Sequence, residues 1–445
     1  MSALLWAFTT TGGRQTFVTE ILGVAYDSQA EHFLRGDVDV DMDSIRHESM
    51  IVNGKVRMYF GPFPAFVRIP LNFVYPAGHG KWSRIAGFCA GLMALFAFAG
   101  LVRTALCSSP LSSRARNWMG NACVIGFAFG SPLLLLLGNL SIYDEAILWG
   151  FGLSLAALFF ALRARCSEGS ARTRALLGFS ICAGGALLSR VTFGAPFILI
   201  APFLALGTTR GNRATNLTML VLPLGAALVF YVWLSYAKFG SFTGVNYDYY
   251  INPVHADFAH KHGVFSLRRI PYSFADYFSL RFPTLGREPP FVRADRHFYD
   301  YPSLYSNDFS EVYLSLLWCS PWLVFGAIMG IICLLRPNND DLFERGATVA
   351  LFAEFLCILS YFALAQRYSA DLYPFLIFCL IVFLRSGGIA LLRSRYLMIA
   401  LIALSVMVNS LATVSWLVDA DQNVPLETKG AWERLLRRHS YEKWR

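Results

Sequence analysis

A dense set of carboxylates lies near the N-terminus of this chain. Asp27 is followed by the alternating run Asp37, Asp39, Asp41 and Asp43. A partly desolvated Asp27 could act as a general base on an incoming hydroxyl group, because burial raises the pKa of a carboxyl group. The alternating residues would share one face of an extended segment and could bind a divalent cation. A solvated acidic loop would account for the same residues.

A second acidic pair, Asp144 and Glu145, comes at the expected start of an apolar helix. The helix macrodipole favours negative charge there, so helix capping is one interpretation. The other is that these residues join Asp27 in one site, where they would polarise a substrate or hold a metal ion.

Arginine residues at expected helix ends could bind phosphate. Arg190 lies between two short apolar runs, and Arg367 and Tyr368 precede another helix, with Asp371 nearby. Guanidinium groups hold phosphate bidentately, although arginines that snorkel beside an aromatic belt would give the same pattern. Glu354 lies inside an apolar run and is a functional candidate by default, unless it makes an interhelical hydrogen bond.

A short turn would present further polar side chains in the first loop. Asn53 and Gly54 mark a hairpin turn, so Lys55, Arg57 and Tyr59 would lie along one edge. We interpret Arg57 as a candidate phosphate ligand. Lys55 and Tyr59 are candidates for contacts with an acceptor.

Two segments are rich in aromatic residues. The run 63–75 contains Arg68 and predicts an in-plane segment at the level of the lipid headgroups. The long segment 238–311 is rich in Tyr, Phe, Pro and Arg. That composition suits a folded or interfacial segment better than a disordered linker.

Membrane helices would position these residues. The chain is 56% apolar and 15% charged, whereas ordinary globular chains carry about 25% charged residues. Apolar runs of about 18 residues or more can cross a hydrocarbon core roughly 30 Å thick. The sequence therefore predicts an all-α polytopic membrane protein with about 10 to 11 transmembrane helices. The runs lie near residues 84–105, 118–138, 145–163, 175–189, 195–209, 216–237, 312–335, 347–364, 372–386 and 396–418. Residues 2–10 would be the outer end of a truncated first helix or a re-entrant or interfacial start.

Every second link between these helices is basic, and this sets their orientation. Cytoplasmic links are enriched in Lys and Arg. The other links would share the non-cytoplasmic face; they are residues 12–83, 138–144, the Arg190 turn, 238–311 and 366–371. We expect a membrane domain over residues 1–418 and a polar non-cytoplasmic tail over residues 419–445.

Several function classes lack support. The net charge of +9 is scattered over short links instead of forming one basic face, which argues against nucleic acid as a partner. None of the nine cysteines lies in the long polar loops, so no disulfide framework is expected there. The sequence has no HExxH, CxxC pair, P-loop or GxSxG motif.

The order of these features resembles the GT-C membrane glycosyltransferases, the superfamily of the protein O-mannosyltransferases and the bacterial lipid A aminoarabinose transferases. The pieces that carry the resemblance are Tyr26-Asp27 with Arg35-Gly36, Tyr59 to Pro64, the turn at Asp144, Leu188 to Arg190, Lys238 to Gly244, and Arg367-Tyr368 before Pro374. The resemblance implies a GT-C-like fold. It also implies transfer of a sugar from a polyprenyl-phosphate donor to a lipid, wall-polysaccharide or protein hydroxyl at the outer face of a bacterial plasma membrane.

The resemblance also implies roles for individual residues. Asp27 matches the first-loop carboxylate of the family and would take the acceptor proton while the lipid phosphate leaves with inversion. Arg190, Arg367 or Arg57 would stabilise that phosphate. Many relatives carry an acidic residue beside the first-loop Asp, whereas Ser28 follows it here. This departure puts paired-carboxylate action or metal binding at that position in doubt.

Two other function classes compete with this interpretation. A transporter or flippase of lipid-linked sugars should line its midplane with polar groups. Here the midplane offers little beyond Glu354. For a non-catalytic assembly subunit, the acidic loops would be surface only.

Overall fold

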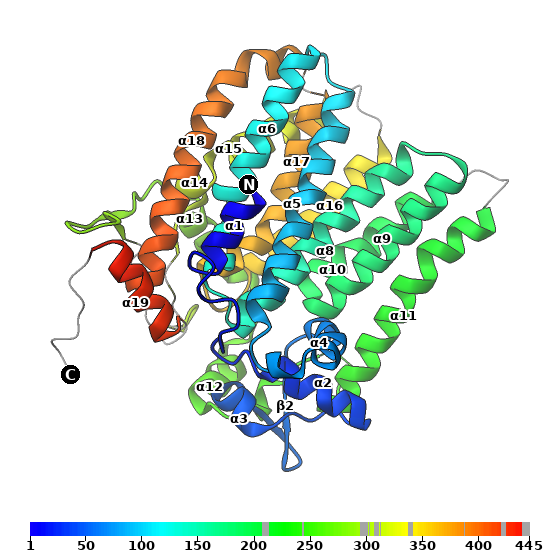
Figure 1. Ribbon diagram of the computed structural model, residues 1–445. Coiled ribbons are helices and arrows are strands. Elements are labelled where there is room, and N and C mark those ends of the chain that lie inside the picture. The colour runs from blue at the N-terminus through cyan, green and yellow to red at the C-terminus, as the bar shows by residue number, and fades with distance from the viewer. Residues whose placement is uncertain are drawn as a thin grey trace.

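The computed structural model describes residues 1–206, 213–242, 244–293, 301, 303–306, 311, 313–336, 341–386, 388–419 and 424–437. Its architecture is a bundle of long helices with irregular segments gathered at one end (Figure 1). Six helices are long and apolar enough to cross a membrane, and shorter apolar helices accompany them. The prediction of an all-α polytopic membrane protein is confirmed.

Each predicted apolar run coincides with one helix or with two helices in succession. The bundle consists of α5 (Ser83–Cys107), α6 (Ser113–Phe129), α7 (Pro132–Gly138), α8 (Ile142–Arg165), α9 (Gly169–Ser189), α10 (Val191–Leu206), α11 (Arg213–Phe239), α14 (Leu316–Cys319), α15 (Pro321–Leu334), α16 (Leu342–Leu359), α17 (Tyr373–Ser386) and α18 (Gly388–Asp419). Prolines divide two of the runs, because Pro132 and Pro321 each open a new helix at a position where no backbone N–H is needed.

Helix α8 lies at the centre of the bundle. It packs against α5 and α9, and nearly all of its side chains are buried. Close approach of helices in lipid depends on small residues at the contact. At Gly152 a Cβ atom would lie 2.7 Å from the backbone oxygen of Ala90 on α5. The contact between α5 and α8 therefore requires glycine at that position.

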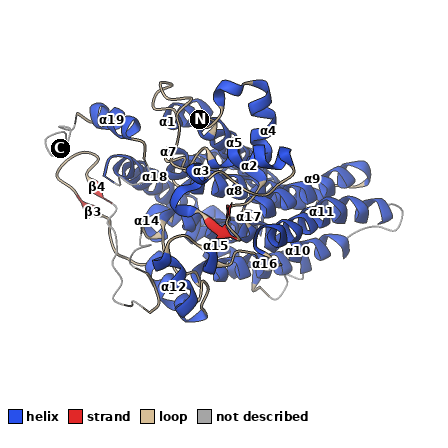
Figure 2. Ribbon diagram, turned by 90° about the horizontal axis from the view of Figure 1, so that it is seen from below, coloured by secondary structure: helices blue, strands red, loops and turns tan. Residues whose placement is uncertain are grey.

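Much of the two large segments between membrane helices lies at the lower end of the bundle in Figure 1. The first contributes α2 (Ala25–Arg35), α3 (Met42–Ile45), η1 (Arg46–Glu48), β1 (Met50–Val52), β2 (Lys55–Arg57), α4 (Phe63–Val74) and η2 (Pro76–Gly78). The second contributes η4 (Tyr247–Tyr249), α12 (Pro253–His262), η5 (Leu267–Arg269), α13 (Ile270–Tyr277), β3 (Thr284–Leu285) and β4 (Val292–Arg293), and η7 (Gln366–Leu372) precedes α17. Figure 2 looks onto this end, with α2, α3 and α12 in front of the bundle.

The predicted hairpin is present in the first segment. Strands β1 and β2 are antiparallel, and Val52 pairs with Lys55 across a turn of two residues. Asn53 and Gly54 both have positive φ, 52° and 75°. These angles match the type I′ turn that Asn-Gly favours. The hairpin also reaches the second segment, because Met50 forms a bridge with Tyr250.

The two ends of the chain pack on this framework. Helix α1 (Ser2–Thr9) contacts α5 and α7, and α19 (Leu426–Leu435) packs on α18. Arg84 at the start of α5 pairs with Glu20 at 2.5 Å and donates to Thr428 at 2.8 Å. The described part of the tail is thus tied to the same end of the bundle as the two large segments. The division of the chain at residue 418 stays a prediction.

The contact between α15 and α17 gives a test of the packing. A Cβ atom at Gly330 on α15 would lie 1.9 Å from the backbone oxygen of Cys379 on α17. We expect Gly330→Ala to separate these helices and to cost about 1–3 kcal/mol, the usual range for overpacking. Thermal unfolding in lipid nanodiscs would measure the loss. The control is Gly225→Ala on α11, where a Cβ atom meets nothing within 4 Å; equal melting temperatures for the two variants would contradict this packing.

Candidate functional site

One group of buried polar side chains surrounds Asp27 at the start of α2. The Arg68 guanidinium on α4 lies between two carboxylates: its Nε is 3.5 Å from Asp27 Oδ2, and its Nη2 donates to Glu145 Oε2 at 2.5 Å. All three side chains are fully buried. Asn72 donates to Asp27 Oδ1 at 2.7 Å, and Trp82 donates to Asn72 at 2.7 Å. We call Asp27, Arg68, Asn72 and Glu145 the carboxylate group.

The protonation of Asp27 depends on two opposing influences. Burial raises the pKa of Asp27 above its ordinary value, and the positive charge of Arg68 opposes this shift. Within the described chain, Asp27 Oδ2 accepts no hydrogen bond. A buried carboxylate with a raised pKa and an oxygen without a donor is suited to accept a proton from a hydroxyl group.

A second group collects around Glu48, a residue that the sequence analysis did not single out. Tyr59 and Tyr250 donate to Glu48 Oε2 at 2.8 and 2.6 Å, and Tyr143 donates to Oε1. Burial, and then the negative charge of Glu48, raise the pKa of Tyr59 well above its ordinary value, so its hydroxyl stays a donor. The three tyrosines come from the two large segments and from α8. Tyr59 thus helps to join these segments, and its contact with an acceptor stays a prediction.

A third group brings two arginines to one aromatic ring. The ζ carbons of Arg190 and Arg367 lie 5.2 and 5.3 Å from the centre of the Tyr368 ring. Arg190 Nε is 3.2 Å from Asp371 Oδ1, and Arg367 Nη2 is 2.6 Å from Glu311 Oε1. The two Nη atoms of Arg190 contact no partner among the described residues, and its side chain is 23% exposed. We call Arg190, Arg367 and Tyr368 the arginine group.

Breaks in the helices place these arginines. Arg190 adopts an extended conformation between α9 and α10, so its side chain leaves the bundle axis where the two helices meet. Arg367 belongs to the 3₁₀ segment η7 that precedes α17. Gly61 packs against this break, because a Cβ atom there would lie 2.2 Å from the backbone oxygen of Leu188. The first large segment thus rests directly on the helix ends that carry Arg190.

Three consecutive residues at the start of α8 connect the groups. The Tyr143 ring lies under the Arg367 guanidinium, 4.2 Å from its ζ carbon, and Asp144 also faces Arg367 electrostatically. Glu145 belongs to the carboxylate group. Tyr26 donates to the backbone oxygen of Ile142 at 3.1 Å and interacts electrostatically with both Asp144 and Glu145. The two residues of the predicted acidic pair therefore differ in their partners: Asp144 faces the arginine group, and Glu145 belongs to the carboxylate group.

Asp144 also contacts the residue that precedes α8. The Ser141 hydroxyl, at the residue that precedes α8, donates to Asp144 Oδ2 at 2.5 Å. A hydroxyl and a carboxylate three residues apart are typical of a helix N-terminus. Among the described residues, no side chain caps a backbone N–H at the start of α8, so the capping interpretation stays a prediction.

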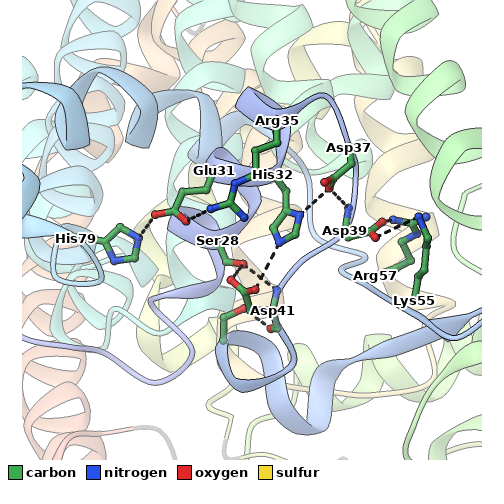
Figure 3. Close-up of polar contacts among 11 residues, drawn as sticks. Ser28, Glu31, His32, Arg35, Asp37, Asp39, Asp41, Lys55, Arg57 and His79 are labelled. Atoms are coloured by element: carbon green, nitrogen blue, oxygen red, sulfur yellow. Dashed lines mark hydrogen bonds and ion pairs between the residues drawn. The ribbon is translucent and has the colours of Figure 1, made fainter.

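The carboxylates of the acidic run pair with neighbouring side chains, and Asp37 and Asp41 share His32 (Figure 3). The pairs are Asp37 with His32 at 2.6 Å, Asp39 with Lys55 at 3.5 Å and with Arg57, and Asp41 with Ser28 at 2.7 Å. Across the ranges that the structure describes, no three Asp, Glu, His or Cys side chains are grouped to hold a metal ion. A metal requirement stays a prediction of the sequence.

The two basic residues of the hairpin belong to this network. Lys55 and Arg57 neutralise Asp39, and neither contacts Arg190 or Arg367 in the described chain. Burial lowers the pKa of Arg57, and Asp37 opposes this shift. The structure therefore brings Asp27, Glu145, Asp144, Arg190, Arg367 and Tyr368 into connected groups and leaves Lys55 and Arg57 at the acidic run.

Sequence reasoning missed Arg68, Asn72 and Glu48 as site residues. Arg68 carried a usable signal, because it is the one charge in the otherwise apolar or polar-neutral run 63–75, and an ionisable residue in such a run usually has a function or a buried partner. Glu48 gave no such signal. Its tyrosine partner in the second segment lies 202 positions away.

Comparison with known proteins finds likeness at the level of structure only. No family model matches the chain, and no curated protein matches it. ArnT from Cupriavidus metallidurans, solved bound to undecaprenyl phosphate, matches 98% of this chain and 76% of its own, with 13% identity and a TM-score of 0.48. The apo state of the same protein gives 12% identity and a TM-score of 0.46, with the same coverage of both chains.

An archaeal protein gives a similar result. The oligosaccharyltransferase AglB from Archaeoglobus fulgidus, solved with an inhibitory peptide and a dolichol-phosphate, matches 99% of this chain and 56% of its own, with 13% identity and a TM-score of 0.47. ArnT and AglB are both GT-C membrane glycosyltransferases. At these identities and scores, function has to be argued from the site itself.

The ion pairs of Arg68 give a test of the carboxylate group. We expect Arg68→Met to lower the free energy of unfolding by about 3–5 kcal/mol, because it leaves two buried carboxylates without their cation. Thermal unfolding of the full chain in nanodiscs would measure the loss. Adding Glu145→Met to this variant should restore part of it, since one unpaired charge is then removed.

The matched control is Arg35→Met, which removes an exposed arginine paired with Glu31 on the same helix. An exposed pair of this kind contributes about 0.5 kcal/mol. A loss for Arg68→Met no larger than that of Arg35→Met would show that the buried pairs do not stabilise this end of the molecule.

Proposed function

We propose that this protein is a membrane glycosyltransferase. It moves a sugar from a polyprenyl-phosphate donor to a hydroxyl group of a lipid, a wall polysaccharide or a protein at the non-cytoplasmic face. The observation that carries the proposal is the pairing of Arg190 and Arg367 on one tyrosine ring, with a buried carboxylate group connected to them through α8.

The arginine group supplies what a lipid phosphate requires. Two guanidinium groups near one ring concentrate positive charge where water is scarce, and this strengthens their attraction for an anion. The free Nη edge of Arg190 can bind phosphate oxygens bidentately. Asp371 and Glu311 balance the charge when no anion is bound. In the proposed reaction, the phosphate formed on departure carries more negative charge than the donor diester, so these arginines favour the transition state.

Asp27 is the proposed general base. It takes the proton of the acceptor hydroxyl while the hydroxyl oxygen bonds to the anomeric carbon. The bond from that carbon to the phosphate oxygen breaks at the same centre, with inversion, and the electron pair leaves on the lipid phosphate. The raised pKa of Asp27 strengthens it as a base relative to an exposed carboxylate.

Helix α4 controls access to this base. Asn72 donates a hydrogen bond to Asp27 Oδ1, and Arg68 lies beside Oδ2. Both residues belong to α4. Phe73 and Val74 at the end of α4 are 89% and 80% exposed, as expected for an amphipathic helix at a lipid surface. An acceptor that reaches Asp27 therefore displaces side chains of α4, which couples acceptor binding to the lipid-facing end of this helix.

A transporter of lipid-linked sugars is the competing function. Its support is Glu354 on α16, whose two buried oxygens accept no hydrogen bond within the described chain. Glu354 also interacts electrostatically with Asp371 and Arg190, so this carboxylate belongs with the polar groups at the end of the bundle where a transferase needs them. A transporter would move donor across vesicles without forming a glycosidic product.

The proposed base gives the first functional test. We expect Asp27→Asn to lower kcat at least about 100-fold, because a general base contributes roughly 10²–10⁴-fold and the new amide cannot take the proton. Transfer from a synthetic polyprenyl-phosphate sugar by purified protein in nanodiscs would be measured by mass spectrometry of the product. The control is Asp43→Asn, an exposed carboxylate of the same segment.

The pH dependence of the wild type belongs to the same test. Asp27 must be charged to act as a base, so activity falls as pH falls through its raised pKa. The acid limb of kcat/KM should then lie above 3.8, the ordinary value for this group. Full activity of Asp27→Asn, or an acid limb at or below that value, would remove Asp27 from the mechanism.

The arginine group gives a second functional test. We expect Arg190→Lys to lower kcat/KM for the donor by about 10–100-fold, because an ammonium group cannot reproduce a bidentate guanidinium contact worth about 1.5–3 kcal/mol. Titration with undecaprenyl phosphate would show a parallel loss of product binding. Arg345→Lys, an exposed arginine at the other end of the bundle, is the control. Unchanged donor kinetics in Arg190→Lys would contradict the assignment.

A further inference from the structure

The opposite end of the bundle contains a cavity that the proposed reaction does not use. It lies between α5 and α6, beside the link that joins them, and has a volume of about 470 Å³. In Figure 1 this link is at the upper end of the bundle, away from α2, α3 and α12. The polar residues of its lining are Arg103, Ser113, Arg116, Asn117 and Asn121.

Three of these side chains have no partner among the residues that the structure describes. Arg103, Asn117 and Asn121 form no hydrogen bond or ion pair with any described residue, and all three are exposed. Polar groups on the lipid-facing side of a membrane helix are costly unless another polar group satisfies them. An arginine near a helix end can reach water by snorkelling, but an asparagine side chain is too short to do so. The two asparagines therefore call for a polar ligand within the membrane.

The polar groups are ordered by depth. Arg116 lies at the rim, where it donates to the backbone oxygen of Cys107 at 3.1 Å and to Ser113 Oγ at 3.4 Å. Asn117 and Asn121 follow on the same face of α6, and at 1.5 Å per residue Asn121 lies about 12 Å from the start of the helix. Deeper still the lining is apolar, with Ala99 and Val124.

This order matches the chemistry of one class of molecule. A glycerophospholipid presents a phosphate, then ester oxygens and then acyl chains along its length. Guanidinium groups bind the phosphate, amide N–H groups donate to ester oxygens, and apolar side chains contact the acyl chains. We propose that the cavity between α5 and α6 binds an anionic phospholipid, with its phosphate at Arg103 and Arg116 and its ester oxygens at Asn117 and Asn121.

The cavity favours an anionic lipid over a zwitterionic one, because a zwitterionic headgroup carries a positive charge as well as the phosphate. Both arginines are positive, and no Asp or Glu lines the cavity. The ammonium group of a choline headgroup would add a third positive charge there without a counter-ion. This assignment is independent of the proposed glycosyltransferase function, because the cavity shares no residue with the carboxylate or arginine groups.

Native mass spectrometry of the full-length protein tests the proposal. The protein, released from detergent, is titrated with phosphatidylglycerol and, separately, with phosphatidylcholine of the same acyl chains. We expect phosphatidylglycerol to bind at least about tenfold more tightly, since it lacks the ammonium group that the two arginines repel. In Arg103→Ala with Arg116→Ala this preference should disappear. Asn117→Leu with Asn121→Leu should weaken both lipids.

The control is Arg114→Ala, which removes an exposed arginine from the same turn of α6 outside the cavity. It should leave the preference unchanged. Competition with sn-glycerol 1-phosphate separates a lipid site from a site for small anions, and a phospholipid site predicts little competition. Equal binding of the two lipids, an equal effect of Arg114→Ala and the double arginine variant, or full competition by the free headgroup would each overturn the proposal.

Discussion

The ion pairs of the buried Arg68 guanidinium fix the end of the molecule that carries the candidate site. A fully buried cation must be neutralised nearby, and Glu145 and Asp27 do so from two other elements. These contacts hold α4 against both α2 and the start of α8. Because α8 is the central helix of the bundle, the first large segment is attached to the membrane domain through charges as well as through apolar packing.

The same requirement explains how the other groups are arranged. Glu48 is buried and is stabilised by tyrosine hydroxyls from different parts of the chain. Arg190 and Arg367 have carboxylate partners of their own in Asp371 and Glu311. Glu48, Arg190 and Arg367 therefore each have compensation within the protein. A substrate that brings its own charge, such as a lipid phosphate, can exchange with these partners at a smaller cost than if the site were apolar.

Glu354 is the exception among the buried carboxylates, since both its oxygens lie without a hydrogen bond in the described chain. It interacts electrostatically with Asp371 and Arg190. Glu354 and the proposed phosphate site therefore belong to one electrostatic unit.

The sequence by itself determined where the membrane helices lie, which links share one end of the bundle and where the hairpin turns. These features depend on local properties: the length of an apolar run, the alternation of basic links and the conformation of Asn53 and Gly54. It also indicated Asp27, Asp144, Arg190 and Arg367 as members of one end. Tertiary structure decided their partners. In the folded chain Arg68 is buried, Arg57 pairs with Asp39, and Glu48 accepts hydrogen bonds from tyrosines that are distant in the sequence. The pairing of buried charges depends on packing between segments far apart in the chain, and no local pattern encodes it.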